Sequence, residues 1–147
     1  MTDHDDAAAL AVQLRLALGR LARELRHSSA AGVTPSQLSA LANLDELGPL
    51  RLGDLAAREG VTPSTTSRTI DALERQQLAE RRTDPADGRA TLIAATDAGR
   101  ELLASLRTRR DALLSAGIER LPTGRRRELR AAVPALVDLV AALRAQP

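Results

Sequence analysis

The chain has 147 residues, 44% of them apolar, and a formal net charge of +2, so it can bury a core and is most simply one domain or one domain with a helical extension. It has no cysteine, which excludes disulfides, thiolate metal sites and cysteine redox sensing, and its two histidines, His4 and His27, lie too far apart in sequence to favour a metal site. No apolar run approaches the roughly 20 residues of a membrane span, and the acidic start MTDHDD is unlike a signal peptide, so we expect a cytoplasmic protein without membrane contact.

The first expected element is an amphipathic helix over residues 7–26. Its apolar stripe repeats every three or four positions and consists of Leu10, Leu14, Ala17, Leu18, Leu21 and Leu25. A second helix is expected after Thr34, because Thr34 and Gln37 can form a capping box and Pro35 suits the first helical position. The Gly-Pro pair at residues 48–49 is expected to end it.

Two further helices follow, separated by a glycine turn. A short helix over residues 52–58 is expected to end at Gly60 in the left-handed conformation, and the next is capped by Thr62 with Pro63 at its first position. At about 100° per residue the latter helix has two sides. The side expected to dock on the domain carries Thr66, Ile70, Leu73 and Gln77, and the polar side carries Ser64, Ser67, Arg68, Asp71 and Arg75.

A β-hairpin is expected next, with strands at residues 79–83 and 90–95. In the turn DPADG, Pro85 presets φ after Asp84, and Gly88 permits a positive φ, so the hairpin should project as a stiff tip.

Arg89 lies beside this tip. Asp87 stands two residues before it and is expected to orient the guanidinium group. An arginine presented in this way suits the narrow, strongly negative minor groove of DNA. The competing interpretation is an arginine that is only solvated or paired on the surface.

Two long helices, at about residues 97–117 and 124–144, are expected to close the chain, with a bend at Pro134. The last has an apolar stripe of Leu129, Val133, Leu136, Val140 and Leu143. Because stripes of this kind at both ends of the chain are too apolar to stand alone, we expect them to pair across a two-fold axis. Such symmetry places two copies of a groove-reading helix about 34 Å apart, and the bound DNA should then be an imperfect palindrome.

The order of these elements is that of a winged helix-turn-helix, so the predicted fold is predominantly α with a small β-hairpin wing and a helical dimerisation region. A helix with a short, polar leading turn can enter the major groove, where its free N–H groups attract phosphate and Ser, Thr and Arg reach base edges. Since Phe, Tyr and Trp are absent, double-stranded DNA must be bound through grooves and phosphates. An ordinary, well-capped surface helix is the alternative interpretation.

Residues 52–103 resemble the MarR family of transcriptional regulators, most specifically in RRTDPADGRATLIAATDAGR. The resemblance implies a homodimer with interlocking terminal helices and a small anionic or phenolic ligand between the DNA-binding lobe and the dimer region. It divides the chain into a dimerisation helix at 1–33, the winged lobe at 34–97 and C-terminal dimerisation helices at 98–147. The DNA-binding residues it implies, with Arg75 added from the polar side of the same helix, are Ser64, Thr65, Ser67, Arg68, Arg75, Asp87, Gly88 and Arg89.

In this family pattern a glycine usually follows the groove-reading helix, and here Gln77 stands in its place. A non-glycine residue in a left-handed cap costs on the order of 1 kcal/mol, so we expect this helix to end differently and to tilt the wing.

The predicted function is sequence-specific DNA binding in transcriptional regulation, as a repressor released by a small molecule. A winged-helix adaptor that binds protein and not DNA is the alternative. An enzyme is disfavoured, because neither histidine lies in a recognisable catalytic pattern and no glycine-rich phosphate loop is present. No cofactor or metal is expected.

Overall fold

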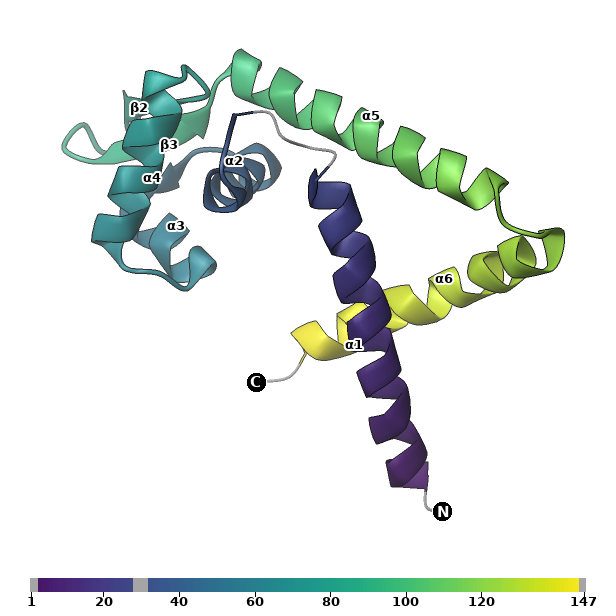
Figure 1. Cartoon of the computed structure of the whole chain (residues 1–147). Coiled ribbons are helices and arrows are strands. Elements are labelled where there is room, and N and C mark those ends of the chain that lie inside the picture. The colour runs from purple at the N-terminus through teal and green to yellow at the C-terminus, as the bar shows by residue number, and fades with distance from the viewer. Residues whose placement is uncertain (1–2, 28–31, 146–147) are drawn as a thin grey trace. The chain divides into compact units, whose positions relative to one another are not determined.

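The computed structural model describes residues 3–27 and 32–145, and it divides the chain into two compact units, Met1–Arg109 and Arg110–Pro147 (Figure 1). The elements are α1 (Asp3–His27), α2 (Pro35–Leu47), β1 (Leu50–Arg51), α3 (Leu52–Glu59), α4 (Pro63–Arg75), β2 (Ala79–Thr83), β3 (Thr91–Ala95), α5 (Asp97–Glu119) and α6 (Thr123–Arg144). The fold is therefore predominantly α with a small antiparallel sheet, as predicted. Among the described residues no helix is long and apolar enough to cross a membrane.

The predicted helix starts in the lobe are confirmed. Thr34 Oγ1 accepts a hydrogen bond from the Gln37 N–H at 3.2 Å, and Gln37 Oε1 accepts one from the Thr34 N–H at 2.7 Å, which completes the capping box of α2. Thr62 caps α4, and Gly60 ends α3 with φ 65°. These local signals place α3 and α4 in the helix-turn-helix order.

The end of α4 corrects one prediction. Gln77 adopts φ 59° and is the one non-glycine residue of the described chain in the left-handed region. The Leu78 N–H donates to the Leu73 carbonyl and the Gln77 N–H to the Glu74 carbonyl, both at 2.9 Å. These are the two bonds of a glycine-type helix end, so the expectation that this helix ends differently is wrong. Gln77 is exposed beyond the helix instead of lying on its buried side.

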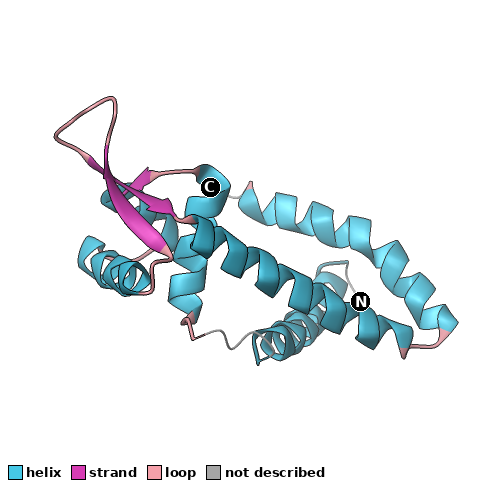
Figure 2. Cartoon of the chain, turned by 90° about the horizontal axis from the view of Figure 1, so that it is seen from above, coloured by secondary structure: helices cyan, strands magenta, loops and turns pink. Residues whose placement is uncertain are grey.

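The sheet has the strand order β1-β3-β2, and both neighbouring pairs are antiparallel. The hairpin register runs from Ala79 opposite Ala95 to Thr83 opposite Thr91, close to the predicted strands. Figure 2 shows the turn between β2 and β3 extending beyond the helices of the lobe. The sequence did not indicate β1, because two residues are too few to show an alternating pattern.

The hydrophobic core is formed by the lobe and the first half of α5, and it holds α4 by one side. Its largest fully buried side chains come from α2, α3, α4, β3 and the first half of α5, and they are Leu41, Leu44, Leu55, Ile70, Leu73, Ile93 and Leu106. Thr66, Ile70 and Leu73 are buried, which confirms three of the four residues predicted for the docked side of α4. The opposite side of this helix is consequently presented to solvent.

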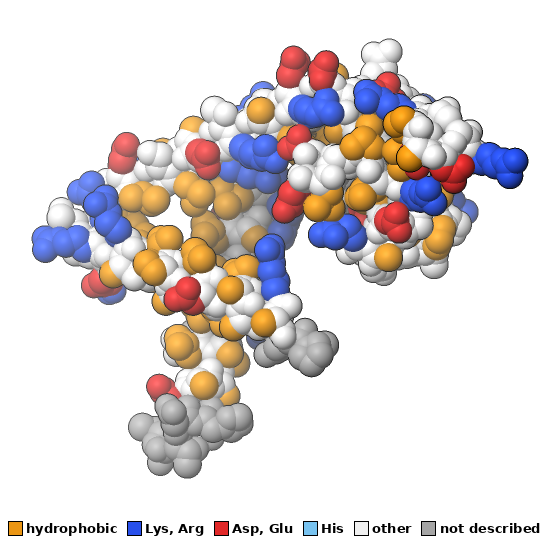
Figure 3. Space-filling model, turned by 180° about the vertical axis from the view of Figure 1, so that it is seen from behind, with side chains coloured by type: hydrophobic (Ala, Val, Ile, Leu, Met, Phe, Trp, Pro, Cys, Tyr) orange, Lys and Arg blue, Asp and Glu red, His pale blue; other side chains and the backbone are white. Residues whose placement is uncertain are grey.

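The terminal helices leave large apolar side chains uncovered (Figure 3). No described residue of α6 is buried. The exposed large hydrophobic residues are Leu10, Val12, Leu16, Leu18 and Leu21 on α1, and Leu129, Val133, Val137, Leu139, Val140 and Leu143 on α6. Helix α6 continues through Pro134. The bend expected there stays a prediction.

Candidate nucleic-acid interface

The leading turn of α4 is polar and open. Thr62 Oγ1 accepts a hydrogen bond from the Thr65 N–H at 3.3 Å and lies 3.0 Å from both the Ser64 and the Thr65 hydroxyl oxygens. Ser64, Thr65 and Arg68 are exposed, and Ser67 is half-buried. The first turn contains no acidic residue, so the positive end of the helix dipole is unopposed there. This arrangement suits the binding of phosphate.

The two carboxylates of α4 are paired within the lobe. Asp71 Oδ1 lies 2.8 Å from the Nη2 atom of Arg81 on β2, and Glu74 pairs with the same guanidinium group. Glu74 also accepts a hydrogen bond from the Arg81 N–H at 3.1 Å. Arg68 and Arg75, by contrast, have no ion pair within the described chain. The outward side of α4 therefore has two free positive charges, and Arg81 joins the helix to the wing.

The wing turn is shaped by two aspartates. The Ala86 N–H donates to Asp84 Oδ1 at 2.9 Å, and the Arg89 N–H donates to Asp87 Oδ1 at 3.1 Å. Each aspartate thus accepts a bond from the backbone two residues later, which stiffens the turn. Asp87, Gly88 and Arg89 are all exposed at this tip.

Two expectations about the tip are wrong. Gly88 does not adopt a positive φ; the glycines of the described chain that do are Gly32, Gly48 and Gly60. Asp87 does not pair with the Arg89 guanidinium group, since its side chain binds the Arg89 backbone and lies 3.7 Å from the Arg51 guanidinium group. Because the aspartates satisfy the turn's N–H groups, the turn closes without a left-handed residue, and the Arg89 side chain remains without an ion pair in the described structure.

Arg51 on β1 is a residue that the sequence did not identify. The Arg51 Nη2 atom lies 3.2 Å from Asp84 Oδ2, and this ion pair connects β1 to the wing turn. The Ala86 N–H, and after it the Arg51 guanidinium group, lower the pKa of Asp84 below its ordinary value. No local pattern links residue 51 with residue 84, so this contact follows only from the strand order.

The described residues contain no cluster of three or more His, Cys, Asp or Glu side chains that could hold a metal ion.

Known proteins share both the sequence and this architecture. The MarR family model matches residues 33–91. A transcriptional regulator of the helix-turn-helix type from Mycobacterium tuberculosis is 36% identical over 137 residues, which cover 92% of this chain and 96% of that protein. A putative transcriptional regulator from Pseudomonas aeruginosa is 32% identical, covers 95% of this chain and 98% of its own, and superposes with a TM-score of 0.81. A mutant of the S. aureus protein MepR, bound to an oligodeoxyribonucleotide, has the same fold, with a TM-score of 0.70 at 19% identity over 89% of this chain and 97% of its own.

Proposed function

This chain belongs to the MarR family and is a DNA-binding transcriptional regulator, and from that premise we propose that α4 enters the major groove while the wing turn lies in the adjacent minor groove. One observation carries the proposal: Arg81 pairs with both carboxylates of α4 and offsets part of their negative charge, whereas Arg68 and Arg75 are left unpaired within the described chain. A helix that repelled phosphate through Asp71 and Glu74 would not suit a groove.

The individual roles follow from position and chemistry. Ser64, Thr65 and Ser67 would contact phosphates and base edges from the leading turn, and Arg68 would read a base edge, most often guanine. Arg75, the last residue of α4, would bind phosphate, although an arginine there also stabilises the negative end of the helix dipole.

In the wing, Arg89 would occupy the minor groove, where a guanidinium group is attracted by the potential of a narrow groove. Asp87 would act through the backbone of Arg89, and Gly88 would allow a close approach to DNA because it has no side chain.

The terminal regions support a homodimer. Residues 1–33 and 98–147 would supply the dimerisation helices and residues 34–97 the DNA-binding lobe. The support is the uncovered apolar surface of α1 and α6, since exposed apolar patches of this extent mark protein interfaces. A two-fold dimer would present two copies of α4 to an imperfectly palindromic operator.

For regulation we propose repression, because a dimer on promoter DNA blocks access to it without needing any further contact. Release by a small anionic or phenolic ligand, a cytoplasmic location and the absence of catalytic activity complete this proposal.

A mobility-shift titration with the DNA flanking the chain's own gene tests the proposal. We expect a saturable shift, and a scrambled duplex of equal length and composition should compete poorly for the protein. The alternative, a winged-helix adaptor without DNA binding, gives no saturable, sequence-dependent shift.

A further inference from the structure

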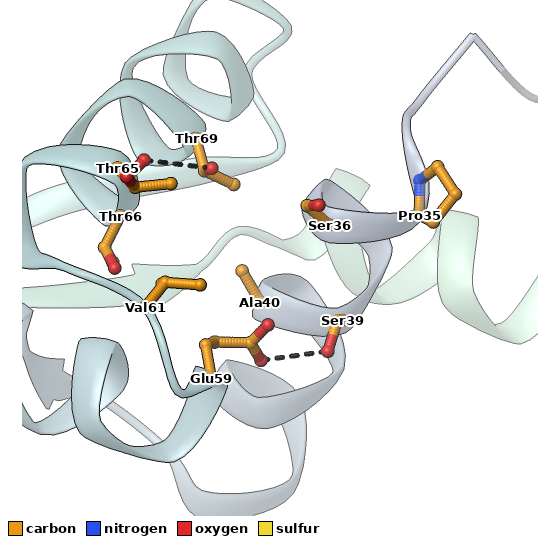
Figure 4. A pocket seen from close by; sticks show the side chains of 9 residues that line it. All are labelled: Pro35, Ser36, Ser39, Ala40, Glu59, Val61, Thr65, Thr66 and Thr69. Carbon is orange, nitrogen blue, oxygen red and sulfur yellow. Dashed lines mark hydrogen bonds between the residues drawn. The ribbon is translucent and has the colours of Figure 1, made fainter.

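The lobe contains a second polar feature, a pocket of about 300 Å³ between α2, the end of α3 and the first half of α4 (Figure 4). Its polar side chains include Glu59, Ser39, Thr65 and Thr69, and its apolar surface comes from Pro35, Ala40 and Val61. No arginine lines it. The pocket thus holds one negative charge and no positive one.

Glu59 has spare capacity to bind a ligand. Its Oε1 atom accepts hydrogen bonds from the Ser39 hydroxyl at 2.9 Å and from the Asn43 amide. Both bonds use the same oxygen, and both donors are neutral. Within the described chain Glu59 Oε2 has no hydrogen bond and the carboxylate has no cationic partner, so one charged oxygen is free to accept a further bond.

Three of the five hydroxyl groups that line the pocket are also acceptors. Thr69 Oγ1 donates its hydrogen to the Thr65 carbonyl and Thr66 Oγ1 donates to the Thr62 carbonyl, both at 3.2 Å, and Ser39 donates to Glu59. A hydroxyl group has one hydrogen and two lone pairs, so each of these three groups can offer a ligand only a lone pair. The pocket therefore complements a molecule that brings donors and a positive charge.

We propose that this pocket binds a small organic cation whose ammonium or guanidinium group lies against Glu59 and whose short apolar part contacts Ala40 and Val61. An anion of the same size would meet the uncompensated carboxylate. Because Thr65 lines the pocket and also belongs to the leading turn of α4, occupancy changes the affinity for DNA; this consequence, unlike the binding itself, rests on the proposed function.

The binding is tested on the free full-length protein by amide NMR titration with butylammonium chloride. Butanol and sodium butyrate at equal ionic strength serve as the neutral and anionic controls. We expect saturable shifts confined to residues around the pocket with butylammonium, affinity for butanol lower by about tenfold, and no localised shifts with butyrate. Equal responses to butylammonium and butanol, or shifts spread over the surface, overturn the proposal.

Two matched variants test whether the negative charge of Glu59 is responsible for the binding. Glu59→Gln keeps an oxygen that can accept from Ser39 and Asn43 but removes the charge, and it should weaken butylammonium binding by about tenfold. Glu46→Gln removes an exposed carboxylate elsewhere on α2 and should bind as the wild type does. Unchanged binding by Glu59→Gln also overturns the proposal; if this variant fails to fold, the three ligands compared on the wild type decide.

A separate DNA titration keeps the two proposals apart. Butylammonium should shift the DNA-binding midpoint of the wild type relative to a sodium chloride control of equal ionic strength. If no DNA binding occurs at all, the proposed function fails, while the titration of the free protein still decides whether the pocket binds the cation.

Discussion

A β-carbon added to Gly99 would lie 2.2 Å from the carbonyl oxygen of Leu78, closer than side chains approach a backbone oxygen. Around this contact the Thr96 N–H donates to the Leu78 carbonyl at 3.1 Å, and the Thr96 hydroxyl donates to the Gln77 carbonyl at 2.7 Å. The same hydroxyl oxygen accepts from the Gly99 N–H at 3.1 Å. The start of α5 is thereby joined to the segment that connects α4 with the wing.

Gly99→Ala should therefore destabilise the protein, although alanine is normally the better residue inside a helix. Relief of the clash requires α5 or the Leu78 backbone to move, and we expect the free energy of unfolding to fall by about 1–3 kcal/mol. Urea denaturation followed by circular dichroism measures it. The control is Gly53→Ala on α3, where an added β-carbon meets nothing within 4 Å, and stability should stay equal or rise by up to about 1 kcal/mol. Equal stability of the two variants would contradict the argument.

The helix boundaries were predictable because their signals are local. Thr34 and Gln37 cap α2 within one turn, and Gly60 ends α3 next to the Thr62 cap of α4. The buried side of α4 was likewise predictable, because it depends only on the helical repeat.

The details of the candidate site depend on residues far apart in sequence and were predicted less well. Arg51 lies 33 positions from Asp84, and their contact exists only because β1 joins the sheet beside β3. Asp87 accepts a hydrogen bond from the Arg89 backbone N–H and does not pair with the Arg89 guanidinium group. A sequence spacing of two residues cannot distinguish these two partners. The left-handed conformation of Gln77 shows that helix-end packing can override a residue's own preference.

The Asp84 contact predicts a dependence on pH. The Ala86 N–H and the Arg51 guanidinium group lower the pKa of Asp84 below its ordinary value of 3.8. Because the folded pKa is the lower one, the order that Asp84 gives the wing is fully present above about pH 4 and is lost as the pH falls through the folded pKa. An NMR titration of the Asp84 carboxyl carbon should show a higher pKa in Arg51→Ala than in the wild type. Arg82→Ala, which removes a wing arginine paired with Glu80, should leave it unchanged; the same Asp84 pKa in wild type and Arg51→Ala would mean that Arg51 does not hold the turn.

The exposed apolar surface of α6 predicts a dimer that a single charge can weaken. Val137 is 62% exposed in the isolated chain. Val137→Glu would bury a carboxylate without a partner in the dimer, so the dissociation constant should rise by at least about tenfold, while Val137→Thr, of nearly the same shape, should have a smaller effect. Light scattering over a concentration series measures both variants. A wild-type chain that is monomeric at micromolar concentration would contradict the proposed dimer and the palindromic operator inferred from it.

The unpaired Arg68 on the leading side of α4 predicts a loss of specificity. Arg68→Ala should cost about 1–3 kcal/mol of binding free energy on the cognate duplex, because a bidentate contact to a base edge disappears. Discrimination should relax at one position in each half-site and stay unchanged at the others. Binding isotherms on a set of single-substituted duplexes measure this, with Arg125→Ala on α6 as the control. A uniform loss across all duplexes would instead assign Arg68 to a phosphate.

Arg89 predicts a different pattern, because a minor-groove arginine responds to the shape and charge of the groove more than to base identity. Arg89→Ala should weaken binding to all duplexes, most where the flanks are rich in A·T pairs. The slope of the logarithm of affinity against the logarithm of salt concentration should fall by about one phosphate-equivalent per wing, since one fewer counterion is displaced.

Asp87→Ala separates orientation from contact. It leaves the Arg89 guanidinium group in place but removes the acceptor of the Arg89 N–H and a neighbour of Arg51, so the turn should loosen and affinity should fall by part of the Arg89→Ala loss. Its salt slope should stay close to that of the wild type, because no cation has been removed. Salt series of the wild type and both variants on cognate and scrambled duplexes distinguish these outcomes. If Arg89→Ala bound cognate DNA as tightly as the wild type at every salt concentration, Arg89 would be an ordinary solvated residue, and α4 alone would have to account for recognition.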